Sequence, residues 1–416
     1  MGEQARRVER IYLLLTLLTT LATSSIWGVN TLFLLDAGLS NAEAFLANAF
    51  YTLGMVVFEI PTGVVADLRG RRFSFVLGAA MLLVSTLLYL LMWYLRAPMW
   101  GWAASSVLIG LGFTFFSGAT EAWLVDALAA NGNTGGLERI FGRAQVVGGV
   151  AMLVGSTVGG LIAQFTNLGV PYLLRAGLLG VTLGVALWFM QDEGFTPLQR
   201  RPLEAVREVL SGAIDGGLRN PPVRWLMLAA PFTAGTGIYV FYALQPMLLD
   251  LYGDPGAYGV AGLATALVAV AQVTGGLLVA RLGRVFGRRT DALLVALLLG
   301  VGLLTLVGLA NSFWLVLVAV AAWSMSSALA LPVRQSYINA AIPSAQRATV
   351  LSFDSLMGSA GGVIAQPALG RVADVAGYQF SLLVSAGIQA FAVPFVLLAR
   401  REQAPGDSLA EPSEPH

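Results

Sequence analysis

Residues 58–73 read FEIPTGVVADLRGRRF, and this stretch decides the fold. An apolar segment that begins near Ala44 ends here, three arginines follow close together, and a second apolar segment begins at once. Arginine is costly to move across a membrane and keeps the loop that carries it on the cytoplasmic side. The stretch therefore predicts a tight cytoplasmic hairpin between two membrane-spanning helices.

The composition of the whole chain agrees with this interpretation. Of 416 residues, 57% are hydrophobic and 11% are charged, whereas about one quarter of the residues of a soluble domain are charged. We therefore predict an all-α polytopic membrane protein. The chain has no cysteine, and its one histidine is the terminal His416. Thiolate metal sites and an imidazole proton relay within the membrane are thus excluded. We expect no metal and no cofactor.

Twelve apolar stretches have the roughly 20 residues that a helix needs to cross the bilayer. The predicted spans are residues 11–35, 43–66, 73–95, 100–128, 140–165, 170–191, 224–251, 257–281, 290–310, 313–340, 348–375 and 378–399.

The positions of the arginines orient these spans. With the N-terminus inside, 20 of the 24 basic residues fall in cytoplasmic segments, and only Arg96, Arg175 and Arg371 fall near the outer face. This asymmetry predicts that both termini are cytoplasmic. The long polar connection separates two halves. The predicted domains are an N-terminal six-helix bundle (1–191), a cytoplasmic central loop (192–222), a C-terminal six-helix bundle (223–400) and a disordered cytoplasmic tail (401–416).

The two halves are repeats of each other. The sequence GGLIAQ at 159–164 in span five recurs as GGVIAQ at 361–366 in span eleven. The hairpin residues Gly63, Asp67, Gly70 and Arg71 also correspond to a weaker copy in the second half, formed by Gly276, Ala280, Gly283 and Arg284. Parallel halves related by an axis along the membrane normal are typical of transporters, in which the solute binds near midplane.

The pattern Gly-x-x-x-Asp-x-x-Gly-Arg-Arg at 63–72 resembles the loop between helices two and three of the major facilitator superfamily (MFS) of secondary transporters. The resemblance covers nearly the whole chain through this hairpin, its weaker copy, the two Gly-Gly-x-Ile-Ala-Gln helices and the 6 + 6 topology. It implies two pseudo-symmetric six-helix bundles that transport a solute by rocker-switch alternating access. Stretches 117–128 and 332–352 look like the same positions in many bacterial members.

The sequence departs from the drug/proton antiporters of this family at two places. Such exporters usually carry an arginine in span four, where this chain has Glu121, and Gly-Pro-x-x-Gly-Gly in span five. Here span five reads GSTVGG at 155–160, with Ser156 in the place of the proline. These departures weaken the antiporter assignment without removing it.

The resemblance implies an inner gate at the hairpin. Arginines at the end of a helix are stabilised by unpaired carbonyl groups and by nearby carboxylates. We expect one of the arginines to reach Asp126 at the inner end of span four. The alternative is that these charges only set the topology. The predicted gate consists of Gly63, Asp67, Gly70, Arg71, Arg72 and Asp126.

Three acidic residues are candidates for proton coupling: Glu121, Glu59 and Asp354. Ionisable groups inside the hydrocarbon are costly and usually face a cavity. Glu121 is the first candidate, and a pair with Arg334 in the symmetry-related span ten would link the two halves. A static buried pair is the structural alternative. For Glu59 we favour an interhelical hydrogen bond near Pro61, and Asp354 is expected to pair with gate arginines or lie in the water-filled mouth.

Polar and aromatic residues suggest a binding cavity. Four residues of span seven recur every three positions and share one face, and similar groups lie in spans one and ten. The candidates are Trp27, Asn30, Thr236, Tyr239, Tyr242, Gln245, Trp323, Ser327 and Arg334. Such a wall suits a bulky, partly apolar solute, although aromatic residues also occur at membrane interfaces.

The sequence therefore predicts a secondary active transporter, not an enzyme, in the plasma (cytoplasmic) inner membrane. By resemblance we expect proton-coupled efflux (antiport) of a small amphipathic, drug-like compound. The alternative is an importer or facilitator of a metabolite, possibly an anion bound by Arg334, and a non-transporting membrane sensor is a remote alternative. The expected partners are the lipid bilayer, a small-molecule substrate and protons. We expect a monomer that binds no nucleic acid.

Overall fold

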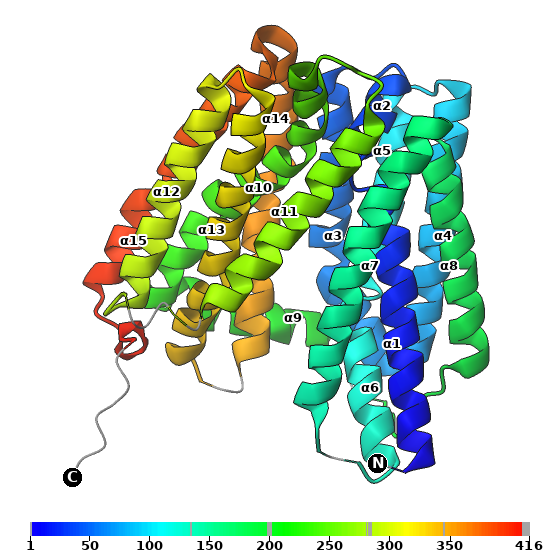
Figure 1. Ribbon diagram of the computed structural model, residues 1–416. Helices are drawn as coiled ribbons and strands as arrows, with labels where there is room; N and C mark the ends of the chain where they lie inside the picture. The colour runs from blue at the N-terminus through cyan, green and yellow to red at the C-terminus, as the bar shows by residue number, and fades with distance from the viewer. Residues whose placement is uncertain are drawn as a thin grey trace. The chain divides into compact units, whose positions relative to one another are not determined.

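The structure, a computed structural model, describes residues 2–133, 135–197, 202–279, 281, 285–343 and 346–409. It consists of long helices joined by short turns (Figure 1). Apolar runs of this length form helices because only a helix satisfies all its backbone groups within lipid. The first half contains α1 (Glu3–Ser24), α2 (Asn30–Asp36), α3 (Asn41–Arg69), α4 (Arg71–Leu95), α5 (Met99–Thr114), α6 (Ala119–Ala130), α7 (Leu137–Phe165) and α8 (Val170–Phe189).

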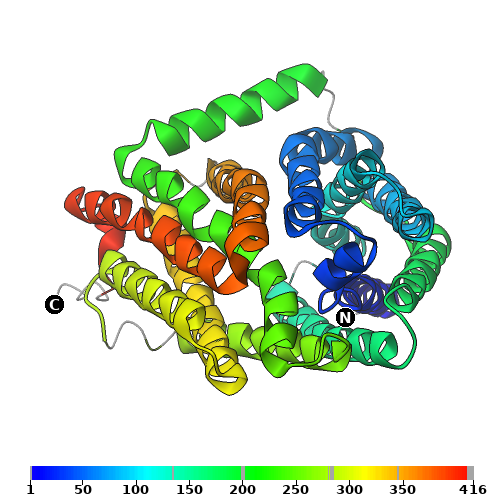
Figure 2. The ribbon, with the colours of Figure 1, turned by 90° about the horizontal axis from the view of Figure 1, so that it is seen from above.

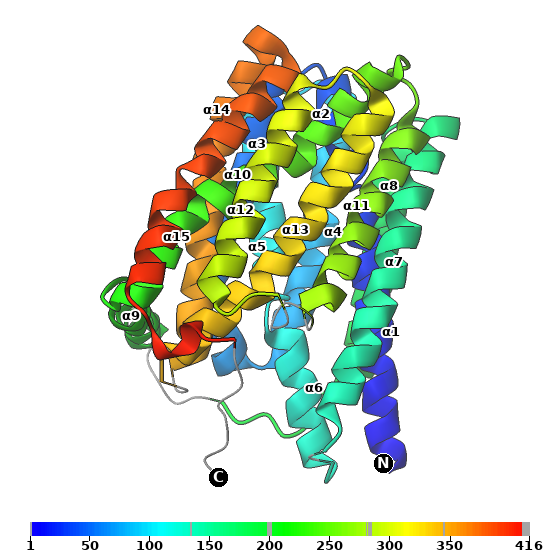
Figure 3. The ribbon, with the colours of Figure 1, turned by 60° about the vertical axis from the view of Figure 1, so that its left-hand side comes forward.

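The second half begins after the polar connection, which itself contains a helix and a π-helical turn. Gly377 has a φ of 83° and bends α14, so this long helix consists of two crossing segments. Figure 3 shows α10, α12, α14 and α15 from the side. The elements are α9 (Pro202–Ala213), the π turn Ile214–Leu218, α10 (Pro221–Tyr252), α11 (Tyr258–Leu278), α12 (Arg289–Leu309), α13 (Phe313–Ala340), α14 (Arg347–Ala390), α15 (Ala392–Arg401) and a 3₁₀ turn at Pro405–Asp407.

Among the described residues, ten stretches are long and apolar enough to cross a membrane. The last of them, Thr349–Arg401, holds the two segments on either side of Gly377, and α1 with α2 supplies the remaining crossing. The predicted all-α fold is thus confirmed, and the described helices are compatible with twelve spans. Two spans are broken, which was not predicted. Span one is interrupted at 25–29, and span four at 115–118, where Gly118 has a φ of 67°.

The chain divides into two compact units. Unit 1 comprises residues 1–207 and 254–266, and unit 2 comprises residues 208–253 and 267–416. The boundary at 207 falls inside the predicted central loop. Residues 254–266, however, pack with unit 1, although the sequence assigned them to the second half. Figure 2 views the helices of unit 1, coloured blue to green, along their axes.

The repeated Gly-Gly motif has the same packing role in each unit. A Cβ on Gly159 of α7 would lie 1.8 Å from the carbonyl oxygen of Ser25, at the break after α1. A Cβ on Gly361 of α14 would lie 2.4 Å from Cα of Pro231 in α10. Small residues let membrane helices approach closely. The motif therefore brings α7 against α1, and α14 against α10.

Part of the predicted tail, residues 402–409, is described by the structure, and its residues 406–408 make hydrogen bonds to the start of α12. The Asp407 side chain is buried and accepts hydrogen bonds from Thr290 N (2.9 Å) and Thr290 Oγ1 (2.8 Å) at the start of α12. Arg289 donates to the carbonyl oxygens of Gly406 and Ser408. A helix start has unpaired N–H groups, and an aspartate binds them. Residues 410–416 lie outside the described residues.

Candidate functional site

The hairpin between α3 and α4 consists of one residue, Gly70. Its φ of 108° is unfavourable for any residue with a side chain. A Cβ here would also lie 2.3 Å from Oδ2 of Asp192. The other oxygen of Asp192 accepts a hydrogen bond from the backbone N–H of Arg72 at 2.8 Å. Asp192 thus places a negative charge at the N-terminus of α4, where the helix dipole stabilises it. Asp192 lies in the polar connection after α8 and was not predicted from the sequence to be part of the hairpin.

The gate residues of the hairpin contact one another within unit 1. Arg71 Nη1 lies 2.5 Å from Asp67 Oδ1, one turn earlier in the chain, and Arg71 Nε lies 3.8 Å from Asp126 Oδ2 in α6. The guanidinium also lies over the ring of Phe195, 6.0 Å from its centroid. Arg71 is therefore the arginine that reaches Asp126. Arg72 points elsewhere and donates to the carbonyl oxygen of Leu187 at 2.7 Å.

The weaker copy of the hairpin lies mostly outside the described residues. Gly276 lies in α11, and Ala280, Gly283 and Arg284 lie outside the described residues. In the first copy, Gly63 lies within α3, and a Cβ there would have no neighbour within 4 Å. Gly63 is therefore not required for close packing, unlike Gly70.

Two of the three acidic candidates lie at the break in span four. Ser117, between α5 and α6, donates a hydrogen bond of 2.6 Å to Glu59 Oε1 of α3. This is the interhelical hydrogen bond that the sequence suggested for Glu59. Glu121 lies in the first turn of α6, four residues after Ser117, and its side chain is exposed. The break thus brings one hydrogen-bonded carboxylate and one exposed carboxylate to the same part of unit 1.

The break in span one carries a buried polar network. Asn30 Nδ2 donates to Asn48 Oδ1 at 2.9 Å, and Tyr172 of α8 donates from its hydroxyl to Asn30 Oδ1, also at 2.9 Å. Asn30 and Asn48 are buried, and Nδ2 of Asn48 has no hydrogen-bond partner within the described part of the chain. Trp27, in the break itself, is half-buried. The side-chain amide of Asn30 therefore has its hydrogen-bond partners within unit 1.

Arg175, which the sequence predicted to lie near the outer face, is a buried cation. The residue lies in α8, five residues after the start of the helix, and is only 3% exposed. Its guanidinium lies over the ring of Phe113 in α5, 5.8 Å from the centroid, and Phe113 packs edge-on against Tyr51. The favourable interaction of a guanidinium with an aromatic face allows this burial. The hydropathy of span six alone does not indicate that Arg175 is buried.

Arg334 does not have the partner that the sequence suggested. The carboxylate that binds it is Asp354 of α14, not Glu121. Arg334 Nε lies 2.9 Å from Asp354 Oδ2, and Arg334 Nη2 lies 2.5 Å from Asp354 Oδ1. The same Nη2 donates to the carbonyl oxygen of Leu226 in α10 at 2.6 Å. Within unit 2, this bidentate pair connects α13 to α14 and α10. The sequence predicted that Asp354 pairs with gate arginines or lies in the water-filled mouth, whereas its partner here is Arg334.

The predicted polar wall of span seven is mostly inside the packing of unit 2. Tyr239 has no exposed surface, and its hydroxyl lies 2.5 Å from Ser381 Oγ and 3.3 Å from the carbonyl oxygen of Leu369. Thr236 is 1% exposed and donates back to the carbonyl oxygen of Phe232. Gln245 is 2% exposed, so Tyr242 alone of the four has appreciable surface. The three-residue spacing identified a common face, but that face is largely buried.

The candidates of span ten differ in exposure. Ser327 is exposed, whereas Trp323 and its neighbour Ser324 are buried in α13. Trp323 Nε1 and Ser324 Oγ have no hydrogen-bond partner among the described residues. Buried polar atoms of this kind are usually satisfied by protein or by ordered water. Ser327 is therefore the one of these three residues whose side chain is exposed, and the polar atoms of Trp323 and Ser324 are enclosed within α13 and its neighbours.

The fold and these residues define a class of protein. Twelve crossings in repeated halves, interrupted spans and intramembrane carboxylates are features of a secondary transporter. The sequence profile of the Major Facilitator Superfamily matches residues 12–260 and 255–415. The chain belongs to this family. It is therefore a multi-pass membrane transporter and not an enzyme.

Individual relatives agree with this assignment. An uncharacterized MFS-type transporter of Methanocaldococcus jannaschii, MJ1560, is 22% identical over 395 residues, which cover 92% of this chain and 97% of the relative. The crystal structure of the nucleoside transporter NupG is similar with a TM-score of 0.79 at 10% identity, covering 95% and 99% of the two chains. A bacterial homolog of the human lysosomal transporter Spinster, solved inward-facing and unoccupied, has a TM-score of 0.73 at 17% identity, covering 99% and 100%.

Proposed function

We propose that this transporter couples the movement of protons to the efflux of a small amphipathic compound. The observation that carries the proposal is the pair of carboxylates at the break between α5 and α6. Glu59 is held by Ser117 of the break, and Glu121 lies exposed in the first turn of α6. A carboxylate within the hydrocarbon region is costly while charged, and its protonation relieves this cost. Glu121 is the first proposed proton carrier, and Glu59 is the second.

The environment of the other candidates supports the same proposal. Arg334 is already bound by Asp354 and by the Leu226 carbonyl, and its side chain is only 14% exposed. It is therefore poorly suited to bind an anionic metabolite, which weakens the importer alternative. In unit 1, Trp27 is a half-buried aromatic residue, and in unit 2, Tyr242 is half-buried and Ser327 is exposed. Such surfaces suit a partly apolar solute.

The hairpin has a proposed role in gating. In alternating access the two halves rock about a central site, so the contacts at the inner end must form and break. We assign this role to Asp67, Arg71 and Asp126, which are in contact within unit 1; in this proposal, rearrangement of these pairs at the inner end of unit 1 accompanies the rocking of the halves. The proposal places both termini in the cytoplasm, in accordance with the arginine distribution, and a single chain as the working unit.

The experiment uses proteoliposomes with an imposed pH gradient and a pH-sensitive dye inside. Cationic, neutral and anionic amphiphiles are added in turn to the wild type, to Glu121→Gln and to Glu59→Gln. We expect one class of amphiphile to evoke proton movement in the wild type. The carrier variant loses this movement but keeps solute exchange at equal pH, because exchange requires no net proton transfer. Glu138→Gln is the matched control, since Glu138 is an exposed carboxylate in the first turn of α7.

Three outcomes separate the alternatives. Solute movement without proton flux, unchanged in both variants, would refute proton coupling and favour a facilitator. Proton-driven accumulation in the direction opposite to efflux would make the protein an importer. A loss of both exchange and proton movement in Glu121→Gln and Glu59→Gln, with Glu138→Gln unaffected, would assign these carboxylates to folding or solute binding instead.

A further inference from the structure

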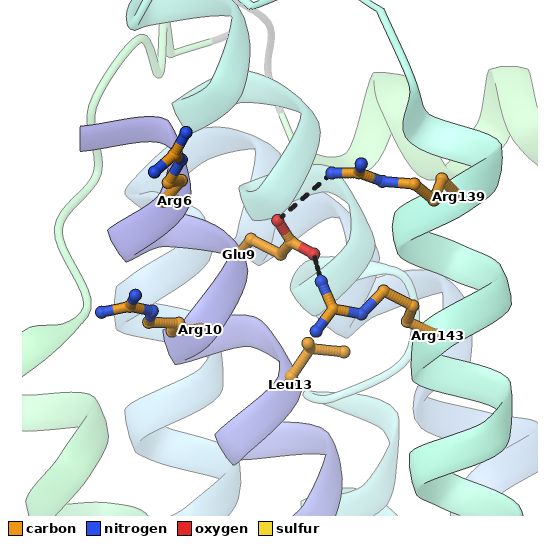
Figure 4. A pocket seen from close by; sticks show the side chains of 6 residues that line it. All are labelled: Arg6, Glu9, Arg10, Leu13, Arg139 and Arg143. Carbon is orange, nitrogen blue, oxygen red and sulfur yellow. Dashed lines mark hydrogen bonds and ion pairs between the residues drawn. The ribbon is translucent and has the colours of Figure 1, made fainter. Parts of the chain in front are cut away.

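A basic pocket lies between the first turns of α1 and α7, away from the break in span four. Its cavity volume is about 360 Å³. Both helices belong to unit 1 and pack against each other along their length. Figure 4 shows the pocket from close by. It is lined by Arg6, Glu9, Arg10, Leu13, Arg139 and Arg143.

The charges of this pocket are unequal. Glu9 is only 5% exposed and lies between the two helices (Figure 4). Arg143 donates to one of its oxygens, and Arg139 Nη2 lies 3.9 Å from the other. Glu9 thus holds both α7 arginines toward the pocket. The side chains of Arg6 and Arg10 are exposed, and within the described residues they make no hydrogen bond or ion pair. The lining thus contains one carboxylate and four guanidinium groups, a formal excess of three positive charges.

The surface next to the pocket is apolar and exposed. Residues three and four apart share one face of a helix, and Arg139 and Arg143 begin such a face on α7. The same face continues with five exposed apolar residues: Val146 (67%), Val150 (55%), Val154 (47%), Val158 (38%) and Leu161 (39%). On α1, the exposed Leu14 (41%) follows Arg10 by one turn. Each helix thus presents arginines at its end and apolar surface toward its middle.

We propose that this pocket binds the phosphate diester of an anionic phospholipid in the cytoplasmic leaflet. The planar guanidinium matches the geometry of phosphate oxygens and binds them through two parallel hydrogen bonds. Basic pockets between transmembrane helices on the cytoplasmic side are suited to anionic headgroups. The apolar faces of α7 and α1 lie where the acyl chains of the same lipid would run. They favour a lipid over a soluble phosphate, which would leave this surface unused. The inference is independent of the transported solute.

The test is native mass spectrometry of the purified, delipidated full-length chain. Dioleoylphosphatidylglycerol is titrated against dioleoylphosphatidylcholine, which has the same phosphate and acyl chains but no net charge. We expect tighter binding of phosphatidylglycerol. Each arginine near an anionic surface contributes about 1 kcal/mol, so Arg10→Gln should weaken binding about 5-fold and Arg6→Gln/Arg10→Gln about 30-fold. Arg7→Gln is the matched control, because Arg7 lies on the same helix but lines a different, much smaller cavity.

The outcomes are distinguishable. These substitutions leave the Glu9 pairs intact, and a single symmetric peak in size-exclusion chromatography establishes folding. Equal binding of the two lipids, or equal effects of Arg10→Gln and Arg7→Gln, overturns the site. Inorganic phosphate and ATP form a further arm. If either binds the lipid-free protein with the same dependence on Arg6 and Arg10 and displaces phosphatidylglycerol, the pocket is a site for soluble anions and the lipid assignment is wrong.

Discussion

The buried pair of Arg334 and Asp354 makes the sharpest prediction about unit 2. Their side chains are 14% and 11% exposed, and two hydrogen bonds join the guanidinium to the carboxylate. Removing one partner of such a pair leaves the other charge buried without compensation, at a cost of about 3–5 kcal/mol. Arg334→Gln and Asp354→Asn should each lower the free energy of unfolding by this amount. For a unit of about 200 residues, this corresponds to a fall in Tm of roughly 10 °C.

The double variant Arg334→Leu/Asp354→Leu separates pairing from other effects. Replacing both members of a buried ion pair by apolar residues of similar size is often neutral, so the double variant should be more stable than either single variant. The exposed pair of Arg219 and Asp215, one turn apart, is the matched control. Exposed pairs contribute well under 1 kcal/mol, and Arg219→Gln should barely change Tm.

The assay is the apparent Tm of the detergent-purified protein, read as the temperature at which half of the size-exclusion peak is lost. If Arg334→Gln and Asp354→Asn behave like Arg219→Gln, the pair does not stabilise unit 2. Arg334 would then again be a candidate for binding an anionic solute. If the losses of the two single variants simply add in the double variant, the two residues act independently and the reasoning fails.

Three further predictions concern unit 1 and use the same measurement of Tm. Gly70→Ala should lower Tm clearly, because alanine disfavours the φ of 108° and its Cβ would meet Asp192. Gly63→Ala should leave Tm unchanged or raise it slightly, because Gly63 is an open position inside a helix. Equal changes in Tm for the two variants would contradict this prediction. Asp192→Asn should cost about 1 kcal/mol by removing the negative charge from the start of α4, and a Tm equal to wild type would show that the charge is unimportant. Tyr172→Phe should cost about 1–3 kcal/mol, because Asn30 Oδ1 loses its buried donor; an unchanged Tm would mean that water replaces it.

Much of the fold could be predicted from the sequence. The hairpin at 58–73 and the apolar runs predicted twelve crossings, and the ends of most helices lie within a few residues of the predicted ends. The family assignment from the hairpin motif is confirmed by the family profile. The breaks at 25–29 and 115–118 were missed, because neither contains a proline and each lies inside a stretch long enough to be a single span. At the candidate site, the hydrogen bond of Glu59 was predicted because Glu59 lies beside Pro61. The contact of Arg71 with Asp126 was predicted because both residues lie at the ends of spans.

Properties that depend on the local chain follow from the sequence alone. They are the assignment to membrane proteins, the positions of the spans and the tight turn at Gly70. The free energy of moving a residue into lipid depends on the type of that residue: it is favourable for apolar side chains and unfavourable for arginine. Only the tertiary structure decided the partners, such as Asp354 for Arg334, Asp192 for the start of α4 and Ser381 for Tyr239. In a membrane helix, the side that faces lipid and the side that faces other helices are both apolar. Hydropathy therefore locates a span but does not indicate which of its residues point inward, and only the packed helices do so.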